Sequence, residues 1–440
     1  MTGPAHDDDR GRLLVEVFDA AFAELTEADP GAMRAKYRKM AHSPHSFYRG
    51  SACLFYADVT GEEDPFVDDR TARIWIHGDL HAENFGTYLN SDGLLVFDVN
   101  DFDEAYVGHF TWDLQRFAAS LALIGWQKAL PEDEIRRLIA CYAESYLGQV
   151  DDYCGTAREE DFALDLDNTG GVVHTALVAA RAMRRSDLLD EVTRIEDGVR
   201  RFSDGPGVRR LEEDERERVV AAYAAYLDTI PADKRSRRPR FYELRDVVGK
   251  QGFGIGSAGL PAYSLLIDGF SQALDNDVVL TMKQANVPAV SRFVDTSAVD
   301  GYFRHEAQRT VISQRALQVH TDPLLGHAEL EGTAYLVSEF SPYEVDLEWA
   351  GLVEPEEITG LVELLGKATA KVHCASDEDS EQDLVDFQVE EAVANALDGR
   401  RGEFAEWLTD WGIRYADRVR ADHALFVDAF REGRIGVTAV

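Results

Sequence analysis

Apolar residues recur at helical spacing over much of the chain. In residues 11–40 the pattern predicts a first amphipathic helix that ends near Asp29. Residues 113–232 have the same period nearly throughout, and we interpret their charge-rich stretches, residues 191–201 and 211–218, as solvated helix faces. Further helices are predicted at residues 303–319 and 358–373. A large helical part is therefore expected.

Short apolar runs typical of strands occupy two other regions. One pair flanks a polar loop, and four more runs follow a basic, proline-containing stretch at residues 232–240, which is either a linker or a phosphate contact. These runs are residues 74–76, 94–97, 241–248, 262–267, 278–283 and 334–340. The pattern predicts an α+β fold in three segments: helices with the polar loop in 1–240, a β-rich segment in 241–345, and helices that return to the first segment in 346–440.

The polar loop carries the clearest chemical signal. It reads His77-Gly78-Asp79-Leu80-His81-Ala82-Glu83-Asn84, and the next strand leads to Asp98, Asp101 and Asp103. Phosphoryl transfer needs one carboxylate that orients or deprotonates the acceptor hydroxyl, and further oxygens that hold magnesium. The spacing therefore predicts a metal and phosphate site. The alternative is a solvated acidic hairpin.

This loop resembles the H-G-D-x-H-x-x-N loop of kinase-fold small-molecule phosphotransferases, the aminoglycoside and choline kinase group, and every letter is present. Those kinases continue with a strand, an Asp-aromatic-acidic turn and a structural Asp at a helix start, which Asp101 to Asp103 and Asp113 fit. The resemblance implies the following roles: Asp79, Asn84 and Asp101 as catalytic residues, Asn84 and Asp101 as magnesium ligands, and Asp98 and Asp103 as further ligand candidates.

A glycine-rich motif lies in the β-rich segment. Gly254, Gly256 and Gly259 make G-x-G-x-x-G, which suits both Rossmann dinucleotide sites and kinase phosphate loops. A Rossmann loop must open a helix, whereas here Pro261 and a run of β-forming residues follow. We therefore expect a strand-turn-strand hairpin, with Gly254, Gly256, Ser257 and Gly259 against the phosphates of a nucleotide.

Lys283 ends the next predicted strand. Only eight of the 45 basic residues are Lys, and an ammonium at the end of an apolar strand needs a polar partner. In the kinase resemblance Lys283 grips the nucleotide phosphates, and Glu306 of the following helix pairs with it, with Gln314 and Gln318 as competitors. Glu339 lies on the strand that runs to the adenine-binding hinge. The alternative for Lys283 is an exposed lysine on an edge strand.

These parts occur in an unusual order. Ordinary kinases place the glycine loop, lysine, helix and hinge before the catalytic loop, whereas here residues 252–340 follow residues 77–103. The resemblance then implies a circularly permuted, bilobal protein-kinase-like fold, with a small β-rich lobe and a large helical lobe. It predicts that the two segments meet across one cleft.

Composition limits the possible partners. The net charge of −36 opposes binding to nucleic acid or an anionic membrane, and the apolar runs are too short to span a bilayer. The four cysteines are widely spaced, and the N-terminal residues lack a signal-peptide pattern, so we expect reduced thiols and a cytoplasmic protein.

The expected activity is transfer of the γ-phosphate of ATP, with Mg²⁺, to a hydroxyl of a small molecule. The acid excess favours a cationic or neutral acceptor. Three alternatives stay open: a pseudokinase-type nucleotide-binding module, an AMP-transferring enzyme, and a metal hydrolase that uses His77 and His81.

Nearly the whole chain is also similar to a prokaryotic family known as domain of unknown function 2252. One of the stretches that carry this similarity, residues 43–51, predicts a turn into an aromatic segment, in which Arg49 holds a phosphate or pairs with an acidic neighbour. The other similar stretches are residues 78–86, 97–104, 241–246, 254–259, Lys283, 314–315 and 322–326. The family adds no activity to the prediction.

Overall fold

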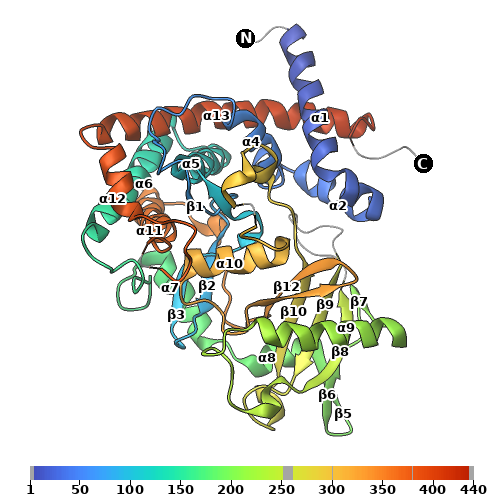
Figure 1. Ribbon diagram of the computed structural model, residues 1–440. Helices are drawn as coiled ribbons and strands as arrows, with labels where there is room; N and C mark the ends of the chain where they lie inside the picture. Colours follow the sequence, from blue (N-terminus) through green and yellow to red (C-terminus); the bar gives the residue numbers. More distant parts are fainter. Residues whose placement is uncertain (1–3, 251–260, 300, 379, 436–440) are drawn as a thin grey trace.

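The computed structural model describes residues 4–250, 261–299, 301–378 and 380–435. Its fold is α+β, with most helices in the upper part of Figure 1 and the main sheet in the lower part. The helices are α1 (Pro4–Ala28), α2 (Pro30–Met40), α3 (Pro44–Arg49), α4 (Ala52–Val59), α5 (Phe110–Gln127), α6 (Glu132–Tyr153), α7 (Gly171–Ala182), α8 (Arg185–Val192), α9 (Glu213–Tyr226), α10 (Glu306–Gln318), α11 (Pro355–Cys374), α12 (Val389–Ala396) and α13 (Arg401–Arg431).

In the described residues the strands form one six-stranded sheet and three two-stranded sheets. They are β1 (Ile74–Ile76), β2 (Phe85–Leu89), β3 (Leu95–Val99), β4 (Tyr106–Gly108), β5 (Thr193–Glu196), β6 (Val199–Phe202), β7 (Val208–Arg209), β8 (Leu244–Lys250), β9 (Ala262–Ile267), β10 (Val278–Gln284), β11 (Gly326–Leu330) and β12 (Thr333–Glu339).

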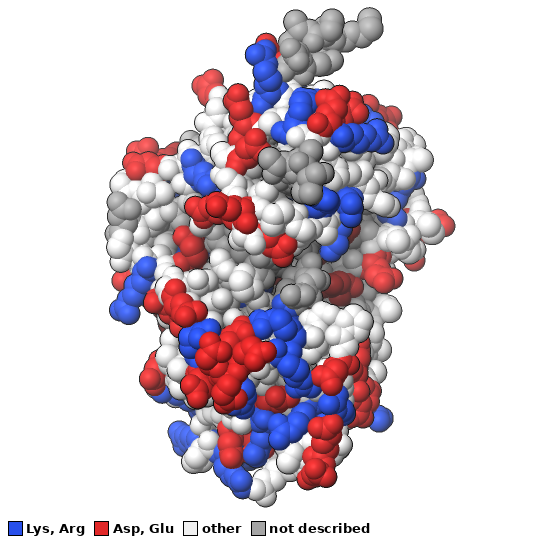
Figure 2. Space-filling view, turned by 90° about the vertical axis from the view of Figure 1, so that its right-hand side faces the viewer, with Lys and Arg blue, Asp and Glu red and all other residues white. Residues whose placement is uncertain are grey.

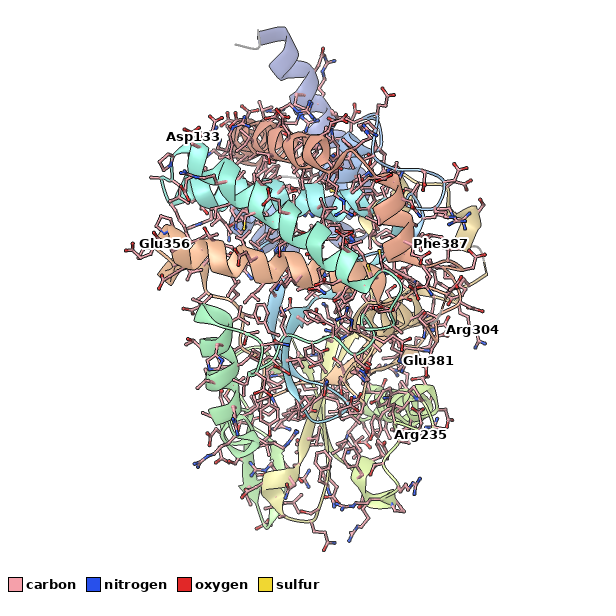
Figure 3. The ribbon with its side chains drawn as sticks, turned by 90° about the vertical axis from the view of Figure 1, so that its left-hand side faces the viewer. Asp133, Arg235, Arg304, Glu356, Glu381 and Phe387 are labelled. Atoms are coloured by element: carbon pink, nitrogen blue, oxygen red, sulfur yellow. The ribbon has the colours of Figure 1, made fainter. Side chains whose placement is uncertain are left out.

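The helical core is built around α5, which is buried along nearly its whole length. Helices α6 and α11 pack side by side and run in the same direction: Asp133 and Glu356, in their first turns, lie at the same end in Figure 3. The Tyr142 hydroxyl donates to Thr369 Oγ1 (2.9 Å), and the Tyr146 hydroxyl lies 2.9 Å from His373 Nδ1. These contacts fix the C-terminal half of α11 against α6.

The large sheet is antiparallel, with strand order β11-β12-β10-β9-β8-β7. Successive side chains point to opposite faces, so Leu265 and Leu266 of β9 belong to two different apolar clusters. Strand β10 is internal, which excludes the edge-strand interpretation of Lys283. Strand β7 and helix α9 precede residue 241 yet pack with the sheet, and Tyr226 of α9 donates to Leu324 O (2.6 Å). The division of the chain at residues 240 and 345 stays a prediction.

Two small antiparallel pairs hold the polar loop. Strand β1 pairs with β4, with Ile76 opposite Tyr106, and β2 pairs with β3, with Gly86 opposite Asp98. The loop between β1 and β2 and the turn η1 (Phe102–Glu104) between β3 and β4 are therefore neighbours.

One local prediction is wrong. Residues 193–202 form the β5–β6 pair instead of a helix, and the buried Arg200 contacts Asp190 (3.1 Å) and Asp277 (3.6 Å). In the stretch predicted as a turn into an aromatic segment, residues 44–49 form helix α3. Ser43 caps this helix by accepting from the Ser46 N–H (3.1 Å), with Pro44 in the first turn.

The first two helices pack on the helical part. Arg10 of α1 donates to Asp58 (2.7 Å) in α4 and to Asp422 (2.9 Å) in α13. This bidentate arrangement ties α1 to both helices. Within the described ranges, no helix has the length and apolar character that a membrane crossing requires.

Candidate active site

Six of the predicted site residues lie together between the helical part and the sheet. A cleft of about 430 Å³ is lined by Asn84, Asp101, Asp103, Lys283 and Glu339, among others. A smaller recess of about 50 Å³ opens beside it, is lined by Asp79, and shares Asp101 and Asp103 with the cleft. Lys283 forms an ion pair with Asp103, 180 positions away in the sequence. Residues 77–103 and the strand that carries Lys283 thus meet, as the sequence predicts.

The backbone of the polar loop is anchored by Asp113, in the first turn of α5. This buried carboxylate accepts from the N–H groups of His77 (2.6 Å) and Gly78 (2.9 Å) and lies 3.2 Å from His373 Nε2. Burial acts to raise the pKa of Asp113, but the bonds from His373 and His77 outweigh it, and the pKa is lowered. The structural role that the sequence predicts for Asp113 is confirmed.

Gly78 allows the loop to pass close to η1. Its φ is +80°, and a Cβ atom placed on it would lie 2.1 Å from Glu104 O. The Gly78 carbonyl accepts from the Tyr56 hydroxyl (2.8 Å), and His77 Nε2 lies 2.8 Å from Asn100 O. The loop conformation is therefore fixed on both sides, and only glycine fits at position 78.

Asp79 is positioned by a buried arginine. Arg116 of α5 is 0% exposed, and its Nε donates to Asp79 Oδ1 (2.5 Å). The guanidinium lies over the rings of Tyr48 (4.4 Å to the centroid) and Phe55 (5.2 Å). Burial raises the pKa of Asp79 to about 7, although Arg116 acts in the opposite direction. The carboxylate thus has a fixed orientation and titrates near neutral pH.

Asn84 and Asp101 lie at the opening of the cleft. The Asn84 Nδ2 donates to Asp79 O (2.9 Å), so its Oδ1 points away from the loop backbone, and the Asn84 carbonyl accepts from the Asn100 N–H (3.0 Å). Asp101 adopts a left-handed conformation with φ of 60°, which is unusual for a residue with a side chain. Burial and the charge of Asp103 raise the pKa of Asp101.

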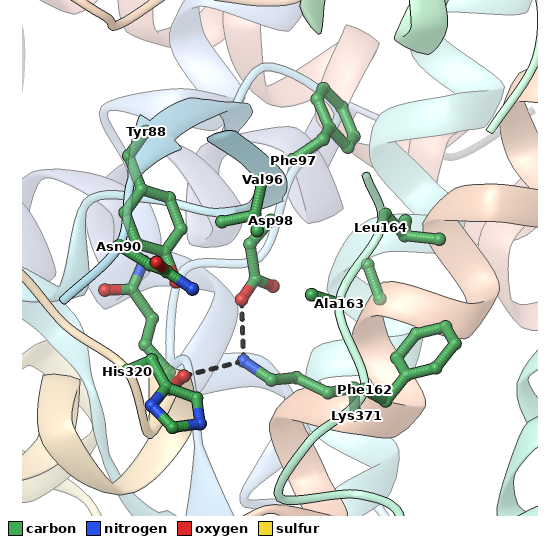
Figure 4. A pocket seen from close by; sticks show the side chains of 12 residues that line it. Tyr88, Asn90, Val96, Phe97, Asp98, Phe162, Ala163, Leu164, His320 and Lys371 are labelled. Atoms are coloured by element: carbon green, nitrogen blue, oxygen red, sulfur yellow. Dashed lines mark hydrogen bonds and ion pairs between the residues drawn. The ribbon is translucent and has the colours of Figure 1, made fainter. Parts of the chain in front are cut away.

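Asp98 does not belong to this site. Its carboxylate accepts from Lys371 of α11 (2.6 Å), whose ammonium also donates to the carbonyls of Leu317 and Gln318 (3.1 Å each). Figure 4 shows this pair in a pocket beside the β2–β3 pair. This pocket shares Tyr88 and Gln318 with the cleft, but Asp98 does not line the cleft. The structure thus does not bring Asp98 together with the other predicted magnesium ligands. Asp98 lies on β3, facing α11, whereas Asp101 lies beyond the strand end.

The predicted pair between Lys283 and Glu306 is wrong. Glu306 accepts from Arg309 Nε (2.7 Å), one helical turn away, while Lys283 contacts Asp103. Burial acts to lower the pKa of Lys283, but the carboxylates of Asp103 and Asp101 outweigh it, and the pKa is raised. Lys283 is thus charged at the cleft.

Arg309 connects α10 to the acidic turn. It is 1% exposed and donates to the carbonyls of Ala105 (2.5 Å), Asp103 (2.7 Å) and Asn286 (3.0 Å). Sequence reasoning missed both Arg309 and Arg116. An available signal was their spacing: each follows an acidic residue by three positions on a helix, in an apolar environment where a guanidinium requires a partner.

Glu339 ends β12 at the far side of the cleft. Its side chain pairs with Arg185, and its N–H donates to Asp322 Oδ2 (2.7 Å). Burial, together with the charge of Glu339, raises the pKa of Asp322 to about 7. Gly254, Gly256, Ser257 and Gly259 lie outside the described residues. The strands that flank them, β8 and β9, pair antiparallel from Lys250 and Ala262 onward, as a hairpin requires.

The comparison with protein families gives one match. The family model described as "Uncharacterized protein conserved in bacteria (DUF2252)" matches residues 28–429, which include both segments that line the cleft. No curated protein and no solved structure matches the chain significantly. Because the matched range covers most of the sequence, the chain belongs to the DUF2252 family.

Proposed function

We propose that the chain is an ATP- and Mg²⁺-dependent phosphotransferase that moves the γ-phosphate to a hydroxyl of a small molecule. One observation carries this proposal: Asp79, Asn84, Asp101 and Lys283 gather around a cleft and its adjoining recess. A carboxylate for the acceptor, oxygen ligands for the metal and a cation for the phosphates are the parts that phosphoryl transfer requires.

Asp79 is suited to the acceptor. In the proposed step the acceptor oxygen bonds to the γ-phosphorus, the bond to the bridging oxygen breaks with its electron pair leaving on ADP, and the hydroxyl proton passes to Asp79. A base whose pKa is about 7 accepts and returns a proton readily at neutral pH. The bond from Arg116 holds one carboxylate oxygen in place, which leaves the other for the acceptor.

Asn84, Asp101 and Asp103 are suited to magnesium. Carboxylate and amide oxygens are its usual protein ligands, and Mg²⁺ commonly takes only one or two carboxylates together with nucleotide phosphates and water. In the described part of the chain no group of three or more His, Cys, Asp or Glu side chains is placed to hold a metal alone. A bound cation would also offset the mutual repulsion of Asp101 and Asp103.

Lys283 is suited to the nucleotide phosphates. In the structure Lys283 pairs with Asp103. On binding of magnesium ATP, Asp103 would contact the metal ion instead and Lys283 the phosphates. The order of β8, β9, Lys283 on β10, α10 and β12 supports the permuted, bilobal kinase-like fold as part of the proposal. Glu339 and the end of β12 would then adjoin the nucleotide base.

A nucleotide-binding module without transfer, or an AMP-transferring enzyme, is the second candidate. The observation that favours it is the engagement of Glu306 with Arg309, since an active kinase would use the helix glutamate to steady Lys283. These candidates predict different products from ATP.

Product analysis separates them. The protein is incubated with ATP, Mg²⁺ and a pool of small hydroxyl compounds, and ADP, AMP and pyrophosphate are quantified by mass spectrometry. We expect ADP, with a loss of roughly 100-fold or more in the Asp79→Asn variant, whose nucleotide affinity stays close to wild type. Pyrophosphate release would indicate AMP transfer. Nucleotide that is bound but unchanged would contradict transfer altogether.

A further inference from the structure

The recess beside Asp79 has features that phosphate transfer alone does not require. Its walls come from α2 (Lys36), α3 (Arg49), α4 (Cys53) and the turn η5 (Ala289–Arg292). Its volume of about 50 Å³ can hold roughly four water molecules, since one water molecule needs about 10–15 Å³ of such space. This is the size of one carboxylate or phosphate group.

Lys36 is a buried lysine with no hydrogen-bonding partner among the described residues. Its residue is 4% exposed, and its Nζ lies 4.2 Å from the centroid of the Phe22 ring. Within the described ranges it makes no hydrogen bond or ion pair. Burial lowers the pKa of its ammonium, and the charges of Cys53, Glu104 and Asp79 act in the opposite direction. An anion bound in the recess would supply the hydrogen-bonding partner that keeps this ammonium charged.

Two arginines also line the recess. Arg292 is exposed, and its guanidinium makes no hydrogen bond or ion pair to any residue that the structure describes. Arg49 pairs with Glu83 through Nη1, as one of the two sequence interpretations expects, but its buried Nε has no partner among the described residues. Lys36, Arg292 and Arg49 therefore offer unused N–H donors around one small volume.

Three of the four carboxylates that line the recess have partners in the structure. Asp79 pairs with Arg116, Asp103 with Lys283, and Glu104 accepts from Asn286 Nδ2 (3.1 Å) and the Ala289 N–H. The fourth, Asp101, is the proposed metal ligand. The acid excess of the whole chain does not decide the local balance: Figure 2 shows Lys and Arg side chains interspersed with Asp and Glu over one face of the molecule.

We propose that this recess binds an anionic group of the acceptor, a carboxylate or a phosphate, through Lys36, Arg292 and the Nε of Arg49. The acceptor is then a small hydroxyl compound that carries a negative charge, with its hydroxyl at Asp79 and its anionic group on the three cations. This inference rests on the proposed function and names its substrate class, in place of the cationic or neutral acceptor that net charge favours.

The test is calorimetric titration of inorganic phosphate and of sodium acetate, at constant ionic strength and with ADP and Mg²⁺ present, into four proteins. These are the wild type, Lys36→Met, Arg292→Gln and the control Lys39→Met, which removes an exposed lysine of the same helix. We expect the wild type to bind at least one of the two anions. Lys36→Met and Arg292→Gln should each weaken it about tenfold or more, as for loss of a charge-assisted hydrogen bond, while Lys39→Met should not.

The two anions identify the group: tighter phosphate binding indicates a phosphorylated acceptor, and tighter acetate binding a carboxylated one. No binding of either anion, or equal binding in Lys36→Met and Lys39→Met, would overturn the inference. Lys36→Met should fold, because it keeps the length of the side chain over Phe22 and removes an unpaired buried charge; an unchanged or higher unfolding midpoint checks this.

Failure of the proposed function has a different signature. If ADP with Mg²⁺ does not bind while anion binding still depends on Lys36, the phosphotransferase proposal fails and the anion site stands. If ADP with Mg²⁺ binds but anion binding is absent, the anion site fails and the phosphotransferase proposal stands.

Discussion

Asp113→Asn tests how the polar loop is held in place. The substitution keeps the shape of the side chain but replaces one acceptor oxygen by an NH₂ group. In the better of the two amide orientations, the remaining oxygen keeps the contacts to the His77 N–H and His373, and the NH₂ faces the Gly78 N–H. One hydrogen bond to a charged group, about 1.5–3 kcal/mol, is lost, and two others weaken by about 1 kcal/mol each. We expect a loss of about 3–5 kcal/mol in the free energy of unfolding.

The matched control is Asp133→Asn, an exposed aspartate in the first turn of α6, as Asp113 is in the first turn of α5. Chemical denaturation of both variants gives the comparison, and the control should lie within about 0.5 kcal/mol of wild type. Because the folded pKa of Asp113 is lowered, its contribution is present above the ordinary value of 3.8 and is lost as pH falls through the folded pKa. A loss below 1 kcal/mol at pH 7, or one that does not shrink in acid, would refute this account of the loop.

Three further predictions concern the loop and its acidic neighbours. Lys371→Met should lower the free energy of unfolding by about 3–5 kcal/mol, because it leaves Asp98 buried without its partner. Magnesium-dependent nucleotide binding should persist in this variant; loss of that binding would indicate that Asp98 belongs to the metal site after all. Asp101→Asn should abolish the magnesium dependence of nucleotide binding in a titration, while the free energy of unfolding changes by less than about 1 kcal/mol. The kcat/KM for ADP formation should rise with pH through about 7 as Asp79 ionises, and a flat profile between pH 5.5 and 8.5 would contradict Asp79 as the base.

Much of the fold follows from local sequence patterns. Strands β1 and β3, helix α10 and helix α11 lie where apolar periodicity predicts them, because each buries one continuous stripe or face. Strand β2, which directly follows the polar loop, was not predicted. The β5–β6 pair was missed because its buried face carries only one apolar residue, Phe202, beside Thr193 and Arg200. A face of this kind gives no apolar stripe, and the charged residues around it were interpreted as a solvated helix.

Within the candidate site, spacing identifies the residues on one loop but not their partners across the chain. Asp79 and Asn84 are fixed by the loop itself, and Asp101 by the turn that follows β3. The partner of Asp98 is Lys371, 273 positions away, and no local pattern could show it. Whether Glu306 pairs with Lys283 or with Arg309 likewise depends on how α10 packs. Arg309 lies one turn away on the same helix and is the partner that Glu306 contacts.

Calorimetric titration of ATP, with and without Mg²⁺, into the wild type and Lys283→Ala tests the central claim most directly. Lys234→Ala, which removes an exposed lysine outside the cleft, is the control. Our account predicts magnesium-dependent binding to the wild type and the control, and a loss of about tenfold or more in affinity for Lys283→Ala. Absence of ATP binding to the wild type, or equal affinity in Lys283→Ala, would contradict a nucleotide site built from these two segments of the chain.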